Sequence, residues 1–266
     1  MANIFADVSK WQQSSAQFFE DAKRIYDLKG AMVQITCSSD EQYANPVGGY
    51  QVYNAYKTFG VVGAYHYFYG APVEEANVFV KYLKKYGLDH TTLVGIDVEE
   101  KSIGSNVTGK INQFLDVVYN AGYHNVCVYA ADSWFSGAID VKKLHHNPKI
   151  WIARIGGKPV HKADAWQYSW TGKVDGDDLD LSYDYSGAFT HELPADNDQF
   201  VESGSRFYSE TGVNIYEDSK LSKNAELRYG KGSTFKGKVV KVGSVTRIKT
   251  SDGYVSGNKK WVKKVK

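Results

Sequence analysis

The first 190 residues alternate between strand-like apolar runs and helix-like segments, and this alternation limits the possible fold more than any other feature. Repeated strand–helix units are typical of a parallel sheet, because parallel strands need a connection of about a dozen residues. The strand-like runs are 4–8, 31–37, 61–69, 93–98, 126–129, 150–155, 165–168 and 179–181; the helix-like segments are 14–28, 46–59, 72–86 and 106–121.

Eight candidate strands in this region predict a small α/β barrel of the TIM type. After about residue 150 the strands follow one another closely, so the last units are expected to lack helices. A doubly wound open sheet is the alternative fold. Its nucleotide-binding version is disfavoured, because the sequence has no G-x-G-x-x-G and no phosphate-loop lysine motif.

The charge of the chain changes sign near residue 205. Residues 206–266 carry 15 Lys and Arg against 5 Asp and Glu, although the 266-residue chain has a net charge of only +2. We therefore predict two domains, 1–190 and 206–266, joined by a polar, acidic linker over 191–205. The basic segment suits nucleic acid, anionic lipid or an anionic polymer such as a bacterial wall.

The basic segment consists of short alternating runs separated by glycine-containing turns, which predicts a small all-β domain. The expected strands are 206–208, 213–216, 234–242, 244–249, 253–255 and 260–265. Cys37 and Cys127 lie in apolar runs and are expected to be buried thiols without a disulfide or metal. We expect neither a secretory signal nor membrane insertion from this sequence.

Two carboxylates end the fourth strand-like run. Asp97 and Glu99 are two positions apart, so in a strand they share a face. Neighbouring carboxyls resist simultaneous ionisation, and one tends to keep its proton. A protonated carboxyl beside an ionised one is what acid-assisted cleavage of a glycosidic bond needs. The alternative is a strand end that becomes polar where it meets solvent.

Two further acids lie on other predicted strands. Asp7 ends the first strand and Asp180 lies in the last. Because the carboxyl ends of barrel strands meet on one rim, we expect both to approach Asp97 and Glu99.

Aromatic residues cluster near the same strand ends and could stack on sugar rings or fill the core. They are Trp11, Tyr65, Tyr67, Tyr129, Trp151 and Trp166. His66 should point away from its two tyrosine neighbours and have a structural role. The pair His145-His146 is expected on the surface, and no metal-ligand spacing stands out.

Six motifs in order resemble the glycoside hydrolase family 25 lysozymes. They are 7–12 (DVSKWQ), 62–67 (VGAYHY), 96–99 (IDVE), 150–153 (IWIA), 166–168 (WQY) and 179–183 (LDLSY). The resemblance covers about residues 3–188. It implies an irregular barrel of five strand–helix units plus three strands. It also implies cleavage of the β-1,4 bond between N-acetylmuramic acid and N-acetylglucosamine in peptidoglycan, without cofactor or metal.

The resemblance also implies a role for each site residue. Glu99 would be the general acid, Asp97 would tune it and stabilise the reacting sugar, and Asp7 and Asp180 would line the pocket. The implied substrate contacts are Tyr65, Tyr67, Tyr129, Trp151 and Gln167. Arg154 and Asp184 stand where the family usually has aromatic residues. We therefore expect the shape of the sugar sites, but not the acid pair, to differ from the family pattern.

Residues 206–266 resemble a bacterial SH3-like wall-binding module, through 212–216 (GVNIY) and 247–255 (RIKTSDGYV). A lysozyme domain joined to such a module resembles a bacteriophage or prophage endolysin, held in the host cytoplasm until it reaches the wall. The implied partners are peptidoglycan and, for the basic module, anionic wall components, rather than nucleic acid or a membrane.

Three other functions compete with this interpretation. A chitinase-like barrel also ends a strand in Asp-x-Glu, but it usually has an acid two residues before the Asp, where this chain has Gly95. The barrel could instead be an inactive wall-binding protein. The basic segment could also bind nucleic acid, but it lacks the pattern of a recognition helix. The sequence leaves the stereochemical course of hydrolysis open.

Overall fold

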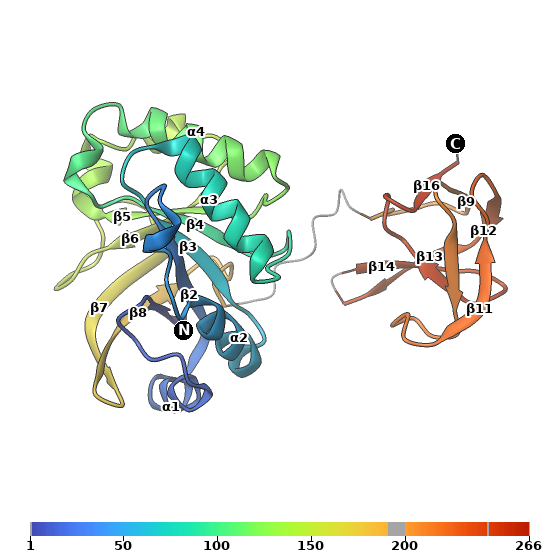
Figure 1. Cartoon of the computed structure of the whole chain (residues 1–266), viewed down its shortest axis with the longest axis horizontal. Coiled ribbons are helices and arrows are strands. Elements are labelled where there is room, and N and C mark those ends of the chain that lie inside the picture. Colours follow the sequence, from blue (N-terminus) through green and yellow to red (C-terminus); the bar gives the residue numbers. More distant parts are fainter. Residues whose placement is uncertain (1, 191–199, 244, 266) are drawn as a thin grey trace. The chain divides into compact units, whose positions relative to one another are not determined.

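The structure is a computed structural model that describes residues 2–190, 200–243 and 245–265. The chain divides into two units, Met1–Leu193 and Pro194–Lys266, which are described separately (Figure 1). Within the described ranges, none of the helices has the length and apolar character needed to cross a membrane.

The first unit is a closed eight-stranded barrel in which neighbouring strands follow chain order (Figure 1). Pairing is parallel from β1 through β7, and β8 is antiparallel to both β7 and β1. The barrel prediction is confirmed and the open-sheet alternative is wrong, because β8 closes onto β1. The strands are β1 Asn3–Val8, β2 Leu28–Cys37, β3 Gly63–Tyr67, β4 Val94–Asp97, β5 Val126–Ala131, β6 Lys149–Ala153, β7 Ala165–Val174 and β8 Asp177–Asp184.

Helices occupy the first four connections of the barrel: α1 Ala16–Tyr26, α2 Gly48–Phe59, α3 Pro72–Lys85 and α4 Val107–Asn120. Local signals set their ends: Ser15 accepts a hydrogen bond from the amide of Phe18, and Gly60 ends α2 with φ of 75°. The expected fifth strand–helix unit has no α-helix. Gly137 interrupts that connection, which holds only the 3₁₀ turns Asp132–Ser136 and Val141–Lys143. Two more 3₁₀ turns are Glu41–Tyr43 and Lys101–Ile103.

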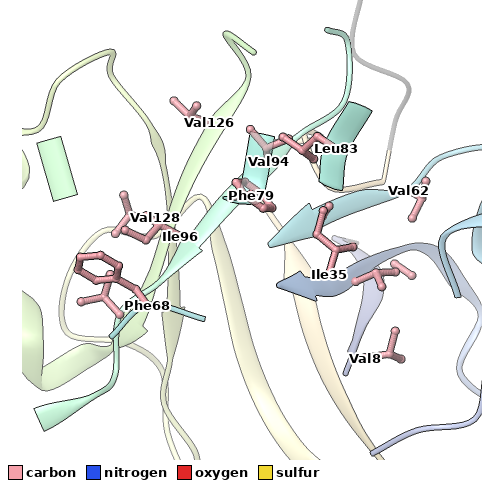
Figure 2. Packing of buried hydrophobic residues seen from close by; sticks show 14 of the residues in the cluster. Val8, Ile35, Val62, Phe68, Phe79, Leu83, Val94, Ile96, Val126 and Val128 are labelled. Atoms are coloured by element: carbon pink, nitrogen blue, oxygen red, sulfur yellow. The ribbon is translucent and has the colours of Figure 1, made fainter. Parts of the chain in front are cut away.

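Alternation along the strands produces two apolar clusters. Outward-facing side chains pack against the helices, and Figure 2 shows part of this layer, including Ile96, Val128 and Phe79. A smaller cluster inside the barrel includes Phe5, Met32, Tyr65, Cys127, Trp151 and Phe189. Burying these two faces is the main stabilising contribution, at roughly 25 cal/mol for each Å² of apolar surface.

His66 faces the outer layer, as predicted, while its neighbour Tyr65 faces the barrel interior. The imidazole is fully buried and contacts Thr36 Oγ1 at 2.8 Å and Glu75 Oε2 at 2.7 Å. Glu75 also accepts hydrogen bonds from the amides of Tyr69 and Ala71. This buried polar network ties α3 to β3 and has a structural role.

The second unit is all-β. It has a five-stranded antiparallel sheet, β11-β10-β15-β14-β13, and a three-stranded one, β12-β9-β16. The strands are β9 Arg206–Ser209, β10 Val213–Tyr216, β11 Asn224–Tyr229, β12 Thr234–Lys236, β13 Lys238–Val242, β14 Val245–Lys249, β15 Tyr254–Ser256 and β16 Val262–Lys264.

Three details of the second unit differ from the predictions. β11 was not among the expected strands, because its residues are mostly exposed, and Gly237 divides the expected strand 234–242 in two. Most of the expected linker, 191–199, lies outside the described residues. Its end is not a linker, because Phe200 bridges to Asn258 and Val201 is buried in the apolar core around Phe207.

Candidate active site

A cleft of about 670 Å³ opens at the carboxyl ends of the parallel strands, and all four predicted carboxylates line it. They are Asp7, Asp97, Glu99 and Asp180. The five predicted substrate contacts, Tyr65, Tyr67, Tyr129, Trp151 and Gln167, line the same cleft. The tertiary fold therefore brings together residues that are separated by up to 173 positions in the chain.

Asp7 and Asp180 approach each other for a reason that differs from the prediction. Asp180 does not end a parallel strand but lies midway along the antiparallel β8. Its Cα pairs with that of Asp7 in the β1–β8 ladder. The antiparallel direction therefore puts the first half of β8, rather than its carboxyl end, at the cleft.

Asp97 is the last residue of β4, and Glu99 lies two residues beyond it. The amide of Val98 still donates to the carbonyl of Tyr129 at 2.9 Å, so the chain stays extended past the strand end. Val98 packs in the outer core while Asp97 and Glu99 line the cleft. The two acids thus share one side of an extended chain, with Asp97 buried and Glu99 exposed to solvent.

Burial and repulsion between like charges raise the pKa values of the clustered carboxyls. Burial raises the pKa of Asp7 and Asp97 well above the ordinary value, and repulsion from the other acids adds to it. Burial followed by the charge of Glu99 raises the pKa of Asp180 to about 6. The pKa of Glu99 is raised by desolvation and then by Glu100. These groups titrate as a set rather than singly.

The structure adds two features to the predicted acid pair. Glu100 is a further neighbour that raises the pKa of Glu99. Repulsion between Asp97 and Glu99 is present as predicted, because Glu99 follows burial as a cause of the raised pKa of Asp97. Oδ1 of Asp97 is buried and has no hydrogen-bond partner among the described residues, which further favours the protonated carboxyl.

Gln167 connects the acids to Tyr129, one of the aromatic residues that line the cleft. Its amide nitrogen donates to Asp180 Oδ2 at 3.0 Å and to Asp7 Oδ2 at 3.4 Å. Its carbonyl oxygen accepts the Tyr129 hydroxyl at 2.8 Å. The donated bonds lower the pKa of both carboxyls, in opposition to burial. Gln167 is itself buried, so it positions and tunes the acids within the wall of the cleft.

Aromatic side chains form the remaining walls. Tyr129 packs against Trp151 with ring centroids 4.6 Å apart, and the Trp151 indole donates to Ser182 Oγ at 3.0 Å. Trp11, 77% exposed, lies on the rim. Trp170 also lines the cleft and is exposed. Such exposed indoles on a cleft rim are suited to stacking on a flat ligand.

Trp166 is not part of the cleft, contrary to the prediction. Gln167 faces the cleft, so Trp166 faces the other way, where its indole donates to the Arg154 carbonyl. Trp170 was missed because the seventh strand was expected to end at residue 168. The Asp175-Gly176 dipeptide, with both φ angles positive, was the available signal, since it turns β7 into β8 as a long hairpin.

Two other expectations are revised, those for Cys37 and Asp184. Cys37 is only half-buried and lines the cleft, whereas Cys127 is fully buried; both are free thiols. Arg154 lines the cleft at the usual aromatic position. Asp184 does not, because its carboxylate accepts amides of the turn at 186–189 at the far end of β8. The departure at Asp184 therefore leaves the shape of the cleft unchanged.

His145 and His146 lie before β6, at the end of the barrel away from the cleft. Both rings contact the Asp116 carboxylate, at 3.0 and 2.7 Å, and these three groups could geometrically hold a metal ion. A separate cavity of about 340 Å³, lined by Met32, Leu93 and Phe189 among others, lies at that same end. None of the four clustered acids reaches either place, so the acidic cleft is the site where chemistry is expected.

The sequence pattern of the glycosyl hydrolases family 25 matches residues 6–177, well over half of the chain. The chain belongs to glycosyl hydrolases family 25. Family membership makes the protein a glycoside hydrolase, which agrees with a cleft lined by carboxyls of raised pKa. No curated protein matches the chain.

Solved structures share the family 25 fold at low sequence identity. The catalytic domain of endolysin ply40 from bacteriophage P40 of Listeria monocytogenes is 24% identical, with a TM-score of 0.61 over 71% of this chain and 96% of that one. The modular autolysin LytC from Streptococcus pneumoniae, in complex with a synthetic peptidoglycan ligand, is 18% identical (TM-score 0.58; 68% and 46% covered). A muramidase from Acremonium alcalophilum is 16% identical (TM-score 0.53; 71% and 99% covered).

Proposed function

We propose that this glycoside hydrolase is an N-acetylmuramidase that cleaves the β-1,4 bond between N-acetylmuramic acid and N-acetylglucosamine in bacterial peptidoglycan. The observation that carries the proposal is the convergence of Asp7, Asp97, Glu99 and Asp180 in one aromatic-lined cleft. The structural neighbours add support, since one is a muramidase and another binds a peptidoglycan ligand.

Glu99 is the general acid of the proposed mechanism. Its raised pKa keeps a proton available, and its exposure lets that proton reach the oxygen of the scissile bond. As the bond breaks, positive charge develops on the sugar, and Asp180, whose pKa of about 6 leaves it ionised at neutral pH, stabilises that charge. Inversion at the anomeric carbon would identify water as the attacking group, whereas retention would indicate a carboxylate or the substrate's N-acetyl group.

The test compares Glu99→Gln with Glu100→Gln as a matched control. Glu100 is adjacent in sequence but accepts the Tyr67 hydroxyl and does not line the cleft. Loss of an acid–base group lowers turnover by about 100-fold to 10,000-fold, so Glu99→Gln should abolish lysis of purified walls. Glu100→Gln leaves the acid in place and removes only a charge that raises the pKa of Glu99, so it should retain most of the lysis at mildly acidic pH.

Wild-type lysis is followed by turbidity, and released fragments are identified by mass. Reducing ends on muramic acid support the muramidase, and reducing ends on N-acetylglucosamine would support the chitinase-like alternative. Wall lysis by Glu99→Gln at the wild-type rate would exclude Glu99 as the acid. Wall binding without lysis by the wild type would identify an inactive binding protein.

We further propose that the second unit is an SH3-like module that binds the wall, and that the whole chain acts as an endolysin of a bacteriophage or prophage, held in the host cytoplasm before it reaches the wall. The small all-β fold of the second unit and its excess of Lys and Arg support the wall-binding role. The full chain should sediment with walls, and less well with walls stripped of phosphate polymers. Equal retention by DNA at the same salt concentration would favour nucleic acid instead.

A further inference from the structure

A side cavity adjoins the catalytic cleft on the family 25 barrel. It measures about 440 Å³ and shares Ala131, Ala153 and Arg154 with the cleft. Its other lining residues are Asp132, Ser133, Ser136, Val160 and His161. Because Ala131 and Ala153 end β5 and β6, the cavity opens on the same rim as the acids. A ligand in the cleft can therefore extend a branch into it.

Asp132 organises this cavity. Its buried carboxylate accepts hydrogen bonds from Arg154 Nη1 at 2.6 Å, the Val160 amide at 2.9 Å, and His161 Nδ1 at 2.8 Å. Burial alone would raise the pKa of Asp132, but these donors outweigh it and hold the pKa well below its ordinary value. One ionised carboxylate thus fixes the loop after β6 and orients the guanidinium of Arg154.

Most of the N–H donors of the Arg154 guanidinium have no protein acceptor within the described residues. Its backbone is held at both ends, by the Gln167 carbonyl at 3.1 Å and by the Trp166 indole at 2.8 Å. A guanidinium has five N–H donors, and within the described residues Asp132 accepts from one of them. The side chain is 41% exposed, so the remaining donors are available to a ligand.

The surroundings of Arg154 carry positive charge. The same loop bears exposed Lys158 and Lys162. Asp132, the acid of the cavity, is already paired with Arg154 and His161. The side cavity therefore attracts an anion, while the neighbouring acidic cleft repels one.

We propose that the side cavity binds a carboxylate of the peptide stem carried by muramic acid, with Arg154 as the residue that recognises it. This inference rests on the proposed function, since a glycan strand in the cleft would carry such a stem on alternate sugars. Arginine suits the task because its planar fork binds a carboxylate through two parallel hydrogen bonds. The cavity is of the size that small-ligand sites have.

The test measures kcat and KM of the full-length wild type on three forms of one glycan. The first carries stems with free carboxylates, the second carries the same stems amidated, and the third has its peptides removed by an amidase. We expect kcat/KM to be about tenfold higher on the first form, mostly through KM, because a charge-assisted hydrogen bond is stronger than a neutral one.

Two variants locate the effect. Arg154→Met should bring the preference for free carboxylates close to one, and Arg154→Lys should keep part of it. Lys158→Met removes a charge from the same loop without altering the cavity lining, so it should keep the wild-type preference. The preference is a ratio measured on one protein, so partial destabilisation of a variant does not change its meaning.

Equal kcat/KM on all three substrates by the wild type would overturn this inference and leave the proposed muramidase intact. An unchanged preference in Arg154→Met, or its equal loss in Lys158→Met, would also overturn it. Failure of the wild type to cleave any of the three would overturn the proposed function, and this inference with it.

Discussion

Replacing Asp180 by Asn should stabilise the barrel at neutral and alkaline pH while lowering activity. The pKa of Asp180 is raised from 3.8 to about 6 by burial and by Glu99. Between these two values the native state holds a proton that the unfolded chain has released. The stability of the wild type therefore falls as the pH rises from about 4 to about 6.

The size of the effect follows from the shift. About two pKa units at 1.36 kcal/mol each correspond to about 3 kcal/mol of lost stability above pH 7. Asp180 is only partly buried, so solvent screening reduces this to about 2 kcal/mol. Asparagine imitates the neutral carboxyl and removes the penalty. It also removes a charge that raises the pKa of Asp7 and Asp97, which acts in the same direction.

Urea unfolding of the full chain at pH 4 and pH 8 checks this prediction. Five of the six tryptophans lie in the first unit, so tryptophan fluorescence follows mainly the barrel. Asp180→Asn should match the wild type at pH 4 and exceed its unfolding free energy by about 2 kcal/mol at pH 8. A variant that is less stable at pH 8, or that differs equally at both pH values, would refute the reasoning.

Two further substitutions test the buried polar contacts. Gln167→Leu removes the amide that donates to Asp180 and Asp7, so the pKa values of both carboxyls should rise. The acidic limb of the pH profile of kcat/KM should then move up by about one pH unit. An acidic limb that does not move would contradict the tuning role of Gln167. Glu75→Gln places an amide nitrogen opposite the backbone amide donors of Tyr69 and Ala71, so it should lower the free energy of unfolding by about 2–3 kcal/mol in urea. An unchanged urea midpoint would show that the buried network is not needed for stability.

Local patterns in the sequence predicted the first four helices and most of the strands, although β11 was missed and β7 runs on to Val174. Apolar spacing and end signals such as Ser15 and Gly60 act within a few residues, so they are legible without the fold. The alternation of side chains along the strand correctly predicted that Tyr65 and His66 point to opposite sides, Tyr65 to the barrel interior and His66 to the layer beneath the helices. The fifth helix was implied by the family resemblance and not by a local pattern, and the structure has only short 3₁₀ turns in that connection.

Strand direction and residue partnership could not be read in this way. The sequence placed Asp180 in the last strand, but its pairing with Asp7 depends on the hairpin that reverses β8. Trp166 and Gln167 are adjacent, yet only Gln167 enters the cleft. Asp132 gave no signal in the sequence, because its role comes from donors 22 to 29 positions away.

By itself, the sequence determined the alternating elements, the acid pair of Asp97 and Glu99, the family resemblance and the change of charge near residue 205. These follow from residue type and short-range spacing, which are properties of the chain alone. The tertiary structure decided which carboxyls share protons, that Gln167 tunes two of them, and that Arg154 borders a second cavity. Those properties depend on burial and on distances of a few ångströms, which exist only once β8 has closed the barrel.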